Sequence, residues 1–129
     1  MLLKEPSAGA IPAYCHLLKR VYMNHYYLND DHSVTPCSMA EWSDQYNAMR
    51  TNKKKHVADE MVDGKRVSTV WLGMDHSLFP SGIKPLIFET MVFDHNSEDI
   101  YCERYSTWHE ALEGHAKAVK WVKDGCKDE

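Results

Sequence analysis

The amino-acid sequence predicts an α+β fold, with a mainly antiparallel sheet of about four strands and two helices packed on it. Three observations predict this class. Asp63-Gly64 separates two strand-like segments, as in a tight β-hairpin. Leu86–Phe93 is an apolar run with the length and composition of a buried strand. Ser38 and Thr107 each precede a helical pattern and have a glutamate three positions later, which is a helix-start signature.

The hairpin is the best-defined element in the sequence. His56–Val62 and Lys65–Met74 flank the Asp-Gly pair, which is typical of a type I′ turn with positive φ. Such a turn fixes the strand register. The expected facing pairs are Val62 with Lys65, Glu60 with Val67, and Val57 with Val70. Along the second strand, Val67, Thr69 and Trp71 are expected on one face of the sheet, and Ser68, Val70 and Leu72 on the other.

Three further segments are predicted as strands. Tyr26-Tyr27-Leu28 is a short strand that ends at the turn-forming residues Asn29-Asp30-Asp31. Leu86–Phe93 is apolar on both faces at all but two positions, which places it in the middle of the sheet. A fourth strand is predicted at about Tyr101–Tyr105, directly before the last helix.

Two helical patterns lie in the first half of the chain. Apolar residues between Ile11 and Met23 recur at near-helical spacing, which predicts a short helix. A second helix is predicted at roughly 38–49, after the Ser38–Glu41 capping box. Its apolar positions are Trp42, Tyr46 and Met49.

The last helix is predicted to begin at Ser106 or Thr107 and to end before Gly125, which suits a C′ residue. Its buried stripe is expected to contain Trp108, Ala111, Leu112, His115, Val119 and Val122. Trp71, Phe88, Trp108 and Leu112 are expected to be largely buried, because each lies on an apolar stripe that another element must cover.

Residues 1–22 are predicted to be an appendage to a single domain of residues 23–129. The capping boxes, the hairpin and the sheet all follow this segment, so removing it is expected to leave a folded domain. No stretch has the ~18 apolar residues of a membrane span, and the first residues lack the pattern of a secretory signal. The expected location is the cytoplasm, and the scattered cysteines are expected to be reduced thiols.

The composition is that of an ordinary globular domain with a mild negative charge. The net charge is −4 with neutral histidines, and the dense basic run is Lys53-Lys54-Lys55. A nucleic-acid-binding protein normally has a basic face, so nucleic acid is not an expected partner. Three adjacent lysines are typical of a solvated loop. The glycine-rich motifs that hold nucleotide phosphates are missing from the sequence, and no cofactor is expected.

One set of acidic and histidine residues suits acid–base or metal chemistry. Asp75-His76 ends the second hairpin strand, Glu89 lies inside an apolar strand, and His115 belongs to the last helix. Carboxylate and imidazole groups together suit zinc, manganese or iron. Neither His-x-x-x-His nor His-Glu-x-x-His occurs, so the prediction is that no metal lies among these residues.

Each member of this set also has a structural interpretation. Asp75-His76 suits loop-forming residues that bond to nearby backbone groups. A buried Glu89 needs a partner, which Arg66, Arg104 or a hydroxyl across the sheet can supply. Nucleophilic catalysis has little support, because no cysteine has a local signature and no serine lies in a Gly-x-Ser-x-Gly elbow.

Aromatic residues crowd the first 50 positions of the chain. Most of them are expected in the core, but an exposed tyrosine-rich patch is also typical of protein-binding surfaces. The candidates for such a surface are Tyr26, Tyr27, Trp42 and Tyr46.

The stretch Arg66–Phe93, followed by Glu103–Ala111 and Gly114-His115, resembles a family of small proteins encoded by tailed phages and prophages. The shared pattern is V-S-T-V-W-L-G-x-D-H, then P-L-I-F-E-T-M-V-F, then R-Y-S-T-W-x-E-A-x-x-G-H, over roughly residues 26–119. The motif positions filled here include Asp75, His76, Glu89, Arg104 and His115. The resemblance implies a viral origin and action inside a bacterium, and it brings no catalytic role to these residues.

Two functional hypotheses follow. The first is a non-enzymatic phage accessory protein that binds a host or phage protein, for example to inhibit a host defence system such as a CRISPR effector. The second is a small metal-dependent enzyme built around Asp75, His76, Glu89 and His115. Small size, mild acidity and the lack of a catalytic motif favour the first hypothesis.

Overall fold

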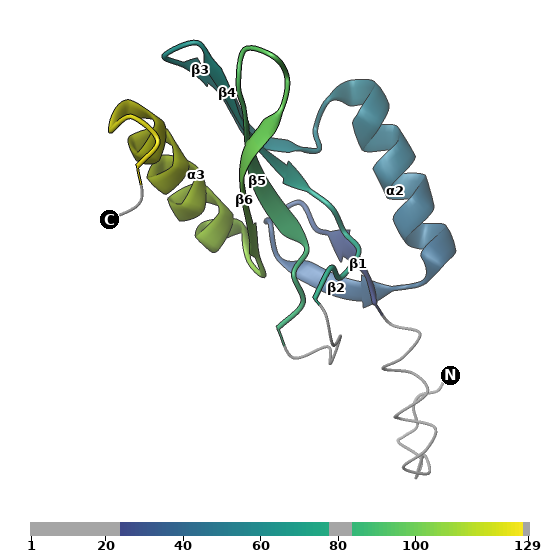
Figure 1. Cartoon of the computed structure of the whole chain (residues 1–129). Helices are drawn as coiled ribbons and strands as arrows, with labels where there is room; N and C mark the ends of the chain where they lie inside the picture. Colours follow the sequence, from purple (N-terminus) through teal and green to yellow (C-terminus); the bar gives the residue numbers. More distant parts are fainter. Residues whose placement is uncertain (1–23, 78–83, 128–129) are drawn as a thin grey trace, which may run out of the picture.

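The computed structural model describes residues 24–77 and 84–127. The elements in chain order are β1 His25–Leu28, β2 Val34–Cys37, α2 Met39–Asn52, β3 His56–Val62, β4 Lys65–Trp71, β5 Phe88–Phe93, β6 Asp99–Tyr105 and α3 Trp108–Lys123 (Figure 1). The strands form two antiparallel sheets, one of β1 and β2 and one in the order β3-β4-β5-β6. The α+β prediction is therefore confirmed. The predicted helix between Ile11 and Met23 lies outside the described residues.

The β3–β4 turn has the predicted geometry. Asp63 and Gly64 have φ angles of 49° and 80°, as a type I′ turn requires. The pairs Val62–Lys65 and Glu60–Val67 form as expected.

The predicted register fails at the far end of β3. His56 faces Val70, and the pairing shifts before Ala58, so the expected pair of Val57 with Val70 is wrong. A β-bulge adds one residue to one strand and displaces all later pairs. The alternation of apolar residues in a short strand does not mark such an insertion.

The centre of the large sheet is β5, which pairs with β4 on one side and β6 on the other. Phe88, Thr90 and Val92 alternate along it and are fully buried. They face the same side as Thr69 and Trp71 of β4, which are also fully buried. The strand predicted at Leu86–Phe93 is thus confirmed as an internal strand that begins two residues later.

Helix α3 covers this buried side of the sheet and contacts all four of its strands (Figure 1). The helix residues that are buried there are Ala111, Gly114, His115, Ala118 and Val122. Leu112 was expected in this stripe, but it is 44% exposed, so that prediction is wrong. The buried stripe is narrow because small residues bring the helix close to the sheet, and Leu112 lies one position, about 100°, beyond it.

Trp108 is half-buried at the start of α3, where its ring stacks on His32 with 3.7 Å between the ring centroids. Thr107 caps the helix by accepting a hydrogen bond from the Glu110 amide. The expected return bond differs, because the Glu110 carboxylate accepts from the amide of Ser106 and not from that of Thr107. Gly125 has a φ of 86° after the helix end, as a C′ residue does.

Helix α2 makes its main contacts with β1 (Figure 1), and its buried residue Met49 belongs to the same core cluster as Trp71 and Ala111. Its N-terminus has the complete predicted capping box between Ser38 and Glu41. The Trp42 indole donates to the carbonyl of Leu72, 3.0 Å away, and so attaches the helix to the end of β4.

Strand β2 was not predicted from the sequence. It contains Pro36, which lacks a backbone donor and is tolerated only in outer strands or at irregular positions. β2 is an outer strand of the small sheet, where Pro36 faces Tyr26.

The other strand of the small sheet, β1, is joined to the rest of the protein along its outer edge. The amide of Tyr26 donates to the carbonyl of Gly73, and the next outward residue, Leu28, is met by a side chain. The Gln45 carboxamide accepts from the Leu28 amide at 2.9 Å and donates to the Leu28 carbonyl at 2.8 Å. A glutamine of α2 therefore replaces a neighbouring strand at this position.

Candidate functional site

Asp75 organises the chain between β4 and β5. Its side chain is nearly buried, and one carboxylate oxygen accepts from the amide and hydroxyl of Ser77 and from the amide of Leu86. These bonds hold the segment after β4 against the segment before β5. This carboxylate oxygen therefore has a structural role, because it already accepts three hydrogen bonds from the protein.

His76 is exposed and bonded locally. Its Nδ1 lies 2.7 Å from the carbonyl of Met74, and its amide donates to the carbonyl of Leu86. Both members of the Asp75-His76 pair therefore bond to nearby backbone groups, as the structural interpretation expected.

Glu89 lies on the face of the large sheet opposite α3, because its neighbours Phe88 and Thr90 face the helix. This face is called the outer face below; it carries Asp59, Met61, Arg66, Glu89, Met91, Cys102 and Arg104. Glu89 accepts from the Arg104 guanidinium at 2.9 Å, which is one of the predicted partners. The two residues are directly opposite each other on β5 and β6.

The thiol of Cys102 is close to this ion pair, with its sulfur 3.6 Å from a Glu89 oxygen. Partial burial raises the pKa of this thiol, and the negative charge of Glu89 raises it further. A raised pKa keeps the thiol protonated at neutral pH, and a protonated thiol is a poor nucleophile and a poor metal ligand.

His115 belongs to a buried polar network between α3 and the sheet. Its Nδ1 lies 2.7 Å from the Thr69 hydroxyl and its Nε2 2.7 Å from a carboxylate oxygen of Glu60. The hydroxyls of Thr69 and Thr90 are 2.5 Å apart, which extends the network across β4 and β5. The sequence did not suggest this network, because its members lie on four elements and share no local motif.

This network has the order carboxylate, imidazole, hydroxyl, which is the order of groups in a hydrolase triad. The hydroxyl of this arrangement is, however, buried. Thr69 and Thr90 have no exposed surface, whereas the Glu60 side chain is half-exposed at the sheet edge. A substrate therefore cannot reach the hydroxyl, and the arrangement serves to satisfy polar groups inside the α3–sheet interface.

The four residues of the predicted cluster do not converge. Glu89 is on the outer face and His115 is on the α3 face, so the sheet separates them. Asp75 and His76 lie beyond the end of β4 and bond to the neighbouring chain. Across residues 24–77 and 84–127, no three histidine, cysteine, aspartate or glutamate side chains are grouped so that they could hold a metal ion.

The aromatic candidates for protein binding are also divided. Tyr26 is buried, so its selection as a surface residue is wrong, and burial raises the pKa of its phenol. Tyr27, its neighbour in β1, faces the other way and is 42% exposed. Trp42 and Tyr46 are half-buried and stack on each other, with ring centroids 5.2 Å apart.

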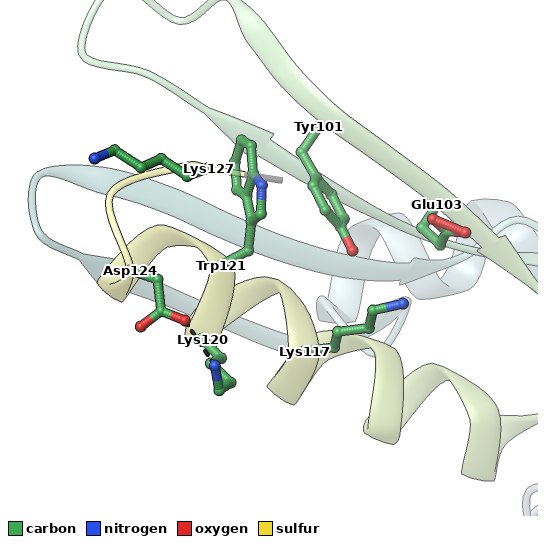
Figure 2. Close-up of a pocket in the computed structure, with 7 residues that line it drawn as sticks. All are labelled: Tyr101, Glu103, Lys117, Lys120, Trp121, Asp124 and Lys127. Atoms are coloured by element: carbon green, nitrogen blue, oxygen red, sulfur yellow. Dashed lines mark hydrogen bonds and ion pairs between the residues drawn. The ribbon is translucent and has the colours of Figure 1, made fainter. Parts of the chain in front are cut away.

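A different surface has the features of a binding site. Between β6 and α3 lies a cavity of about 450 Å³, which is called the β6 groove (Figure 2). It is lined by Tyr101, Glu103, Lys117, Lys120, Trp121, Asp124 and Lys127. The rings of Tyr101 and Trp121 form its apolar part, with centroids 4.9 Å apart. The sequence contains one local hint of it, since Lys117 and Trp121 are one helical turn apart on α3.

Charges surround this aromatic pair. In the view of Figure 2, Lys117 and Lys127 lie at opposite ends of the row of side chains. Lys120 donates to the Asp124 carboxylate at 2.6 Å, which neutralises that carboxylate locally. The groove thus combines an aromatic centre with three lysines and two carboxylates, in a protein whose net charge is −4.

The β6 groove lies beside an uncovered strand edge. Strand β6 is the last strand of the large sheet, and within the described residues its outer side has no strand partner. Five of its seven residues are exposed. Strand edges of this kind can pair with an extended segment of another chain.

Comparison with known proteins returned no match among protein-family models, curated proteins or solved structures. None of the described helices has the length and apolar character needed to cross a membrane.

Proposed function

We propose that this chain is a small non-enzymatic protein that binds a protein partner through β6 and the β6 groove. The observation that carries the proposal is the outer edge of β6, a seven-residue strand with β5 on one side and no described strand on the other. Extended segments of partner proteins add to such edges through main-chain hydrogen bonds, and adjacent pockets provide the specificity.

The opposite edge of the same sheet, at β3, is protected. Its pairing with β4 is interrupted by the bulge near Val57. Asp59 is held by Arg66 through two bonds of 2.9 Å, and Glu60 is held by His115. Bulges and charged side chains are the usual means by which proteins prevent pairing at an edge.

The pairing of β6 with β5 also shifts once, between Val92 and Phe93, and Ile100 has no facing partner there. The pairing of β6 with β5 is continuous from Tyr101 to Tyr105, so its outer edge is straight enough to accept another strand over this length. The cavity that lies beside β6 supports it as the binding edge.

The chemistry of the predicted cluster supports binding over catalysis. Asp75, Glu89 and His115 each bond to a different protein group, and the hydroxyl next to His115 is sealed from solvent. An enzyme built on these residues would need them around one accessible position.

The resemblance to phage-encoded proteins supports a more specific version of this proposal. The protein would then be a phage accessory protein that acts inside an infected bacterium by binding a host or phage protein. One such role is the inhibition of a host defence system such as a CRISPR effector.

The test is affinity capture from phage-infected cells, with the full chain as bait and four variants compared with it. Lys117→Glu and Trp121→Ala alter the β6 groove. Lys123→Glu alters an exposed lysine of the same helix outside the groove, and Met61→Lys alters the exposed outer face. We expect the wild type and the two controls to capture the same partner, and the groove variants to lose it.

Thermal melts of all four variants establish that each is folded. Equal capture by every folded variant would contradict the proposal. Loss of capture with Met61→Lys alone would move the binding surface to the outer face and would equally contradict it.

A further inference from the structure

We infer that the segment bound at β6 is an extended acidic peptide with an apolar side chain at its centre. The inference rests on the proposed function and specifies its partner. It follows from three properties of the edge and the groove: the direction of the β6 side chains, the aromatic pair and the distribution of charge.

The direction of the side chains decides what enters the groove. Tyr101 and Glu103 face the same side as the buried β5 residues Val92 and Thr90, which is the side of α3. A segment added beside β6 would continue this alternation, with every second side chain on the α3 side. Those side chains would enter the β6 groove, and the others would lie on the outer face.

The aromatic pair favours an apolar side chain at the centre of the segment. Tyr101 and Trp121 are both half-buried, and their rings meet at an angle of 46°. Aromatic rings prefer edge-to-face or offset contact with a third ring or an aliphatic group. A phenylalanine, leucine or valine of the segment would cover the remaining exposed surface of this pair.

The charges favour acidic residues on either side of that apolar side chain. Lys117 and Lys127 lie toward the two ends of the groove, and Lys120 balances Asp124. An added strand has its next groove-facing side chains two positions away, about 7 Å, on each side of the centre. Carboxylates at those positions would be directed toward the lysines.

Lysines and aromatic rings also suit single-stranded nucleic acid, which stacks its bases and neutralises its phosphates in this way. One feature favours a peptide. The edge of β6 offers main-chain donors and acceptors in the spacing of a strand, which only another extended polypeptide matches throughout.

The experiment uses a synthetic probe that has the length of β6. The acidic peptide Thr-Glu-Thr-Phe-Thr-Glu-Thr, with blocked ends, is titrated into the ¹⁵N-labelled full chain and followed by NMR. We expect shifts in β6 and in the second half of α3. The peptide with lysine in place of glutamate should bind ~10-fold more weakly, since two attractive contacts become repulsive.

Two variants and two further probes test the parts separately. Lys117→Glu should weaken the acidic peptide and strengthen the basic one, whereas Lys123→Glu should change neither. Of two acidic peptides that are N-methylated at alternate positions, the one methylated on the pairing side should lose binding, because its donors are removed. A seven-nucleotide oligothymidylate is the nucleic-acid probe.

The outcomes separate this inference from the proposed function. Equal binding of acidic and basic peptides, or tighter binding of the oligothymidylate, would overturn the inference. If a cellular partner is captured and its capture requires Lys117, but no peptide binds, the inference is overturned and the proposed function stands. Loss of both the capture and the peptide binding would overturn both.

Discussion

Thr69 connects two other polar groups inside the protein, the Thr90 hydroxyl and the His115 ring. Because all three are buried, replacing Thr69 by the isosteric valine removes the partner of His115 Nδ1 and one partner of the Thr90 hydroxyl, where water cannot replace them. We expect Thr69→Val to lower the free energy of unfolding by ~1–3 kcal/mol, measured by urea denaturation.

The matched control for this change is Thr51→Val, the same substitution at an exposed position of α2. It should stay within ~0.5 kcal/mol of the parent. Equal effects at the two positions would show that the buried network does not contribute to stability.

Gly114 illustrates a residue whose role depends on one neighbour. A Cβ atom at this position would overlap the phenol ring of Tyr105, which packs against the helix backbone. Alanine is favoured over glycine inside a helix by ~1 kcal/mol, so propensity alone predicts that Gly114→Ala stabilises the protein. We expect the opposite, a net loss of ~1–3 kcal/mol, because the ring must move.

A double-mutant cycle checks this assignment. In a Tyr105→Leu background the smaller side chain leaves room, so Gly114→Ala should there be neutral or stabilising. An equal loss in both backgrounds, measured by thermal or urea unfolding, would show that the ring is not the cause.

At the scale of elements, the β3–β4 hairpin depends on backbone conformation and not on space. Gly64 has a φ of 80°, and no atom lies within 4 Å of the position where its Cβ would be. Gly64→Val is therefore expected to cost ~1–3 kcal/mol through φ alone. Asparagine tolerates positive φ, so Gly64→Asn should cost less, and equal melting temperatures for the two variants would contradict this explanation.

The elements that the sequence predicted well are those with a local signal. The Asp63-Gly64 turn, the Ser38 cap and the apolar run in β5 each depend on neighbouring residues, and each is confirmed. The features that it missed depend on residues far apart in the chain. The bulge near Val57 and the exposure of Leu112 are set by packing between elements, which periodicity does not encode.

The candidate site was the least predictable part for the same reason. Asp75, His76, Glu89 and His115 attracted attention because of their chemical type, and the fold places them at separate positions. The β6 groove was not predicted because Tyr101 and Trp121 come from a strand and a helix that approach each other only in three dimensions.

At the scale of the whole molecule, stability should decrease at alkaline pH. Burial raises the pKa of Tyr105 to about 12, whereas the unfolded chain has the ordinary value of about 10. The folded state therefore retains the proton over this range and the unfolded state loses it. The corresponding stabilisation is complete below pH ~10 and is lost as the pH rises toward ~12.

Tyr105→Phe is the control, because it removes the ionisable group and keeps the ring. The parent should lose more of its unfolding free energy than this variant between pH 9 and pH ~12, measured by urea unfolding at each pH. Parallel pH profiles would exclude Tyr105 as the source. Because burial also raises the pKa of Tyr26, some decline should remain in the variant.

The glutamine that borders β1 has a consequence for local motion. The Leu28 amide belongs to a two-stranded sheet, and such small units usually open often enough for their amides to exchange with solvent. Here that amide donates to Gln45 of α2, so its hydrogen can exchange only when the helix and the strand separate. The protection of Leu28 against hydrogen exchange should therefore follow the stability of α2, and the strand and the helix should open together as one cooperative unit.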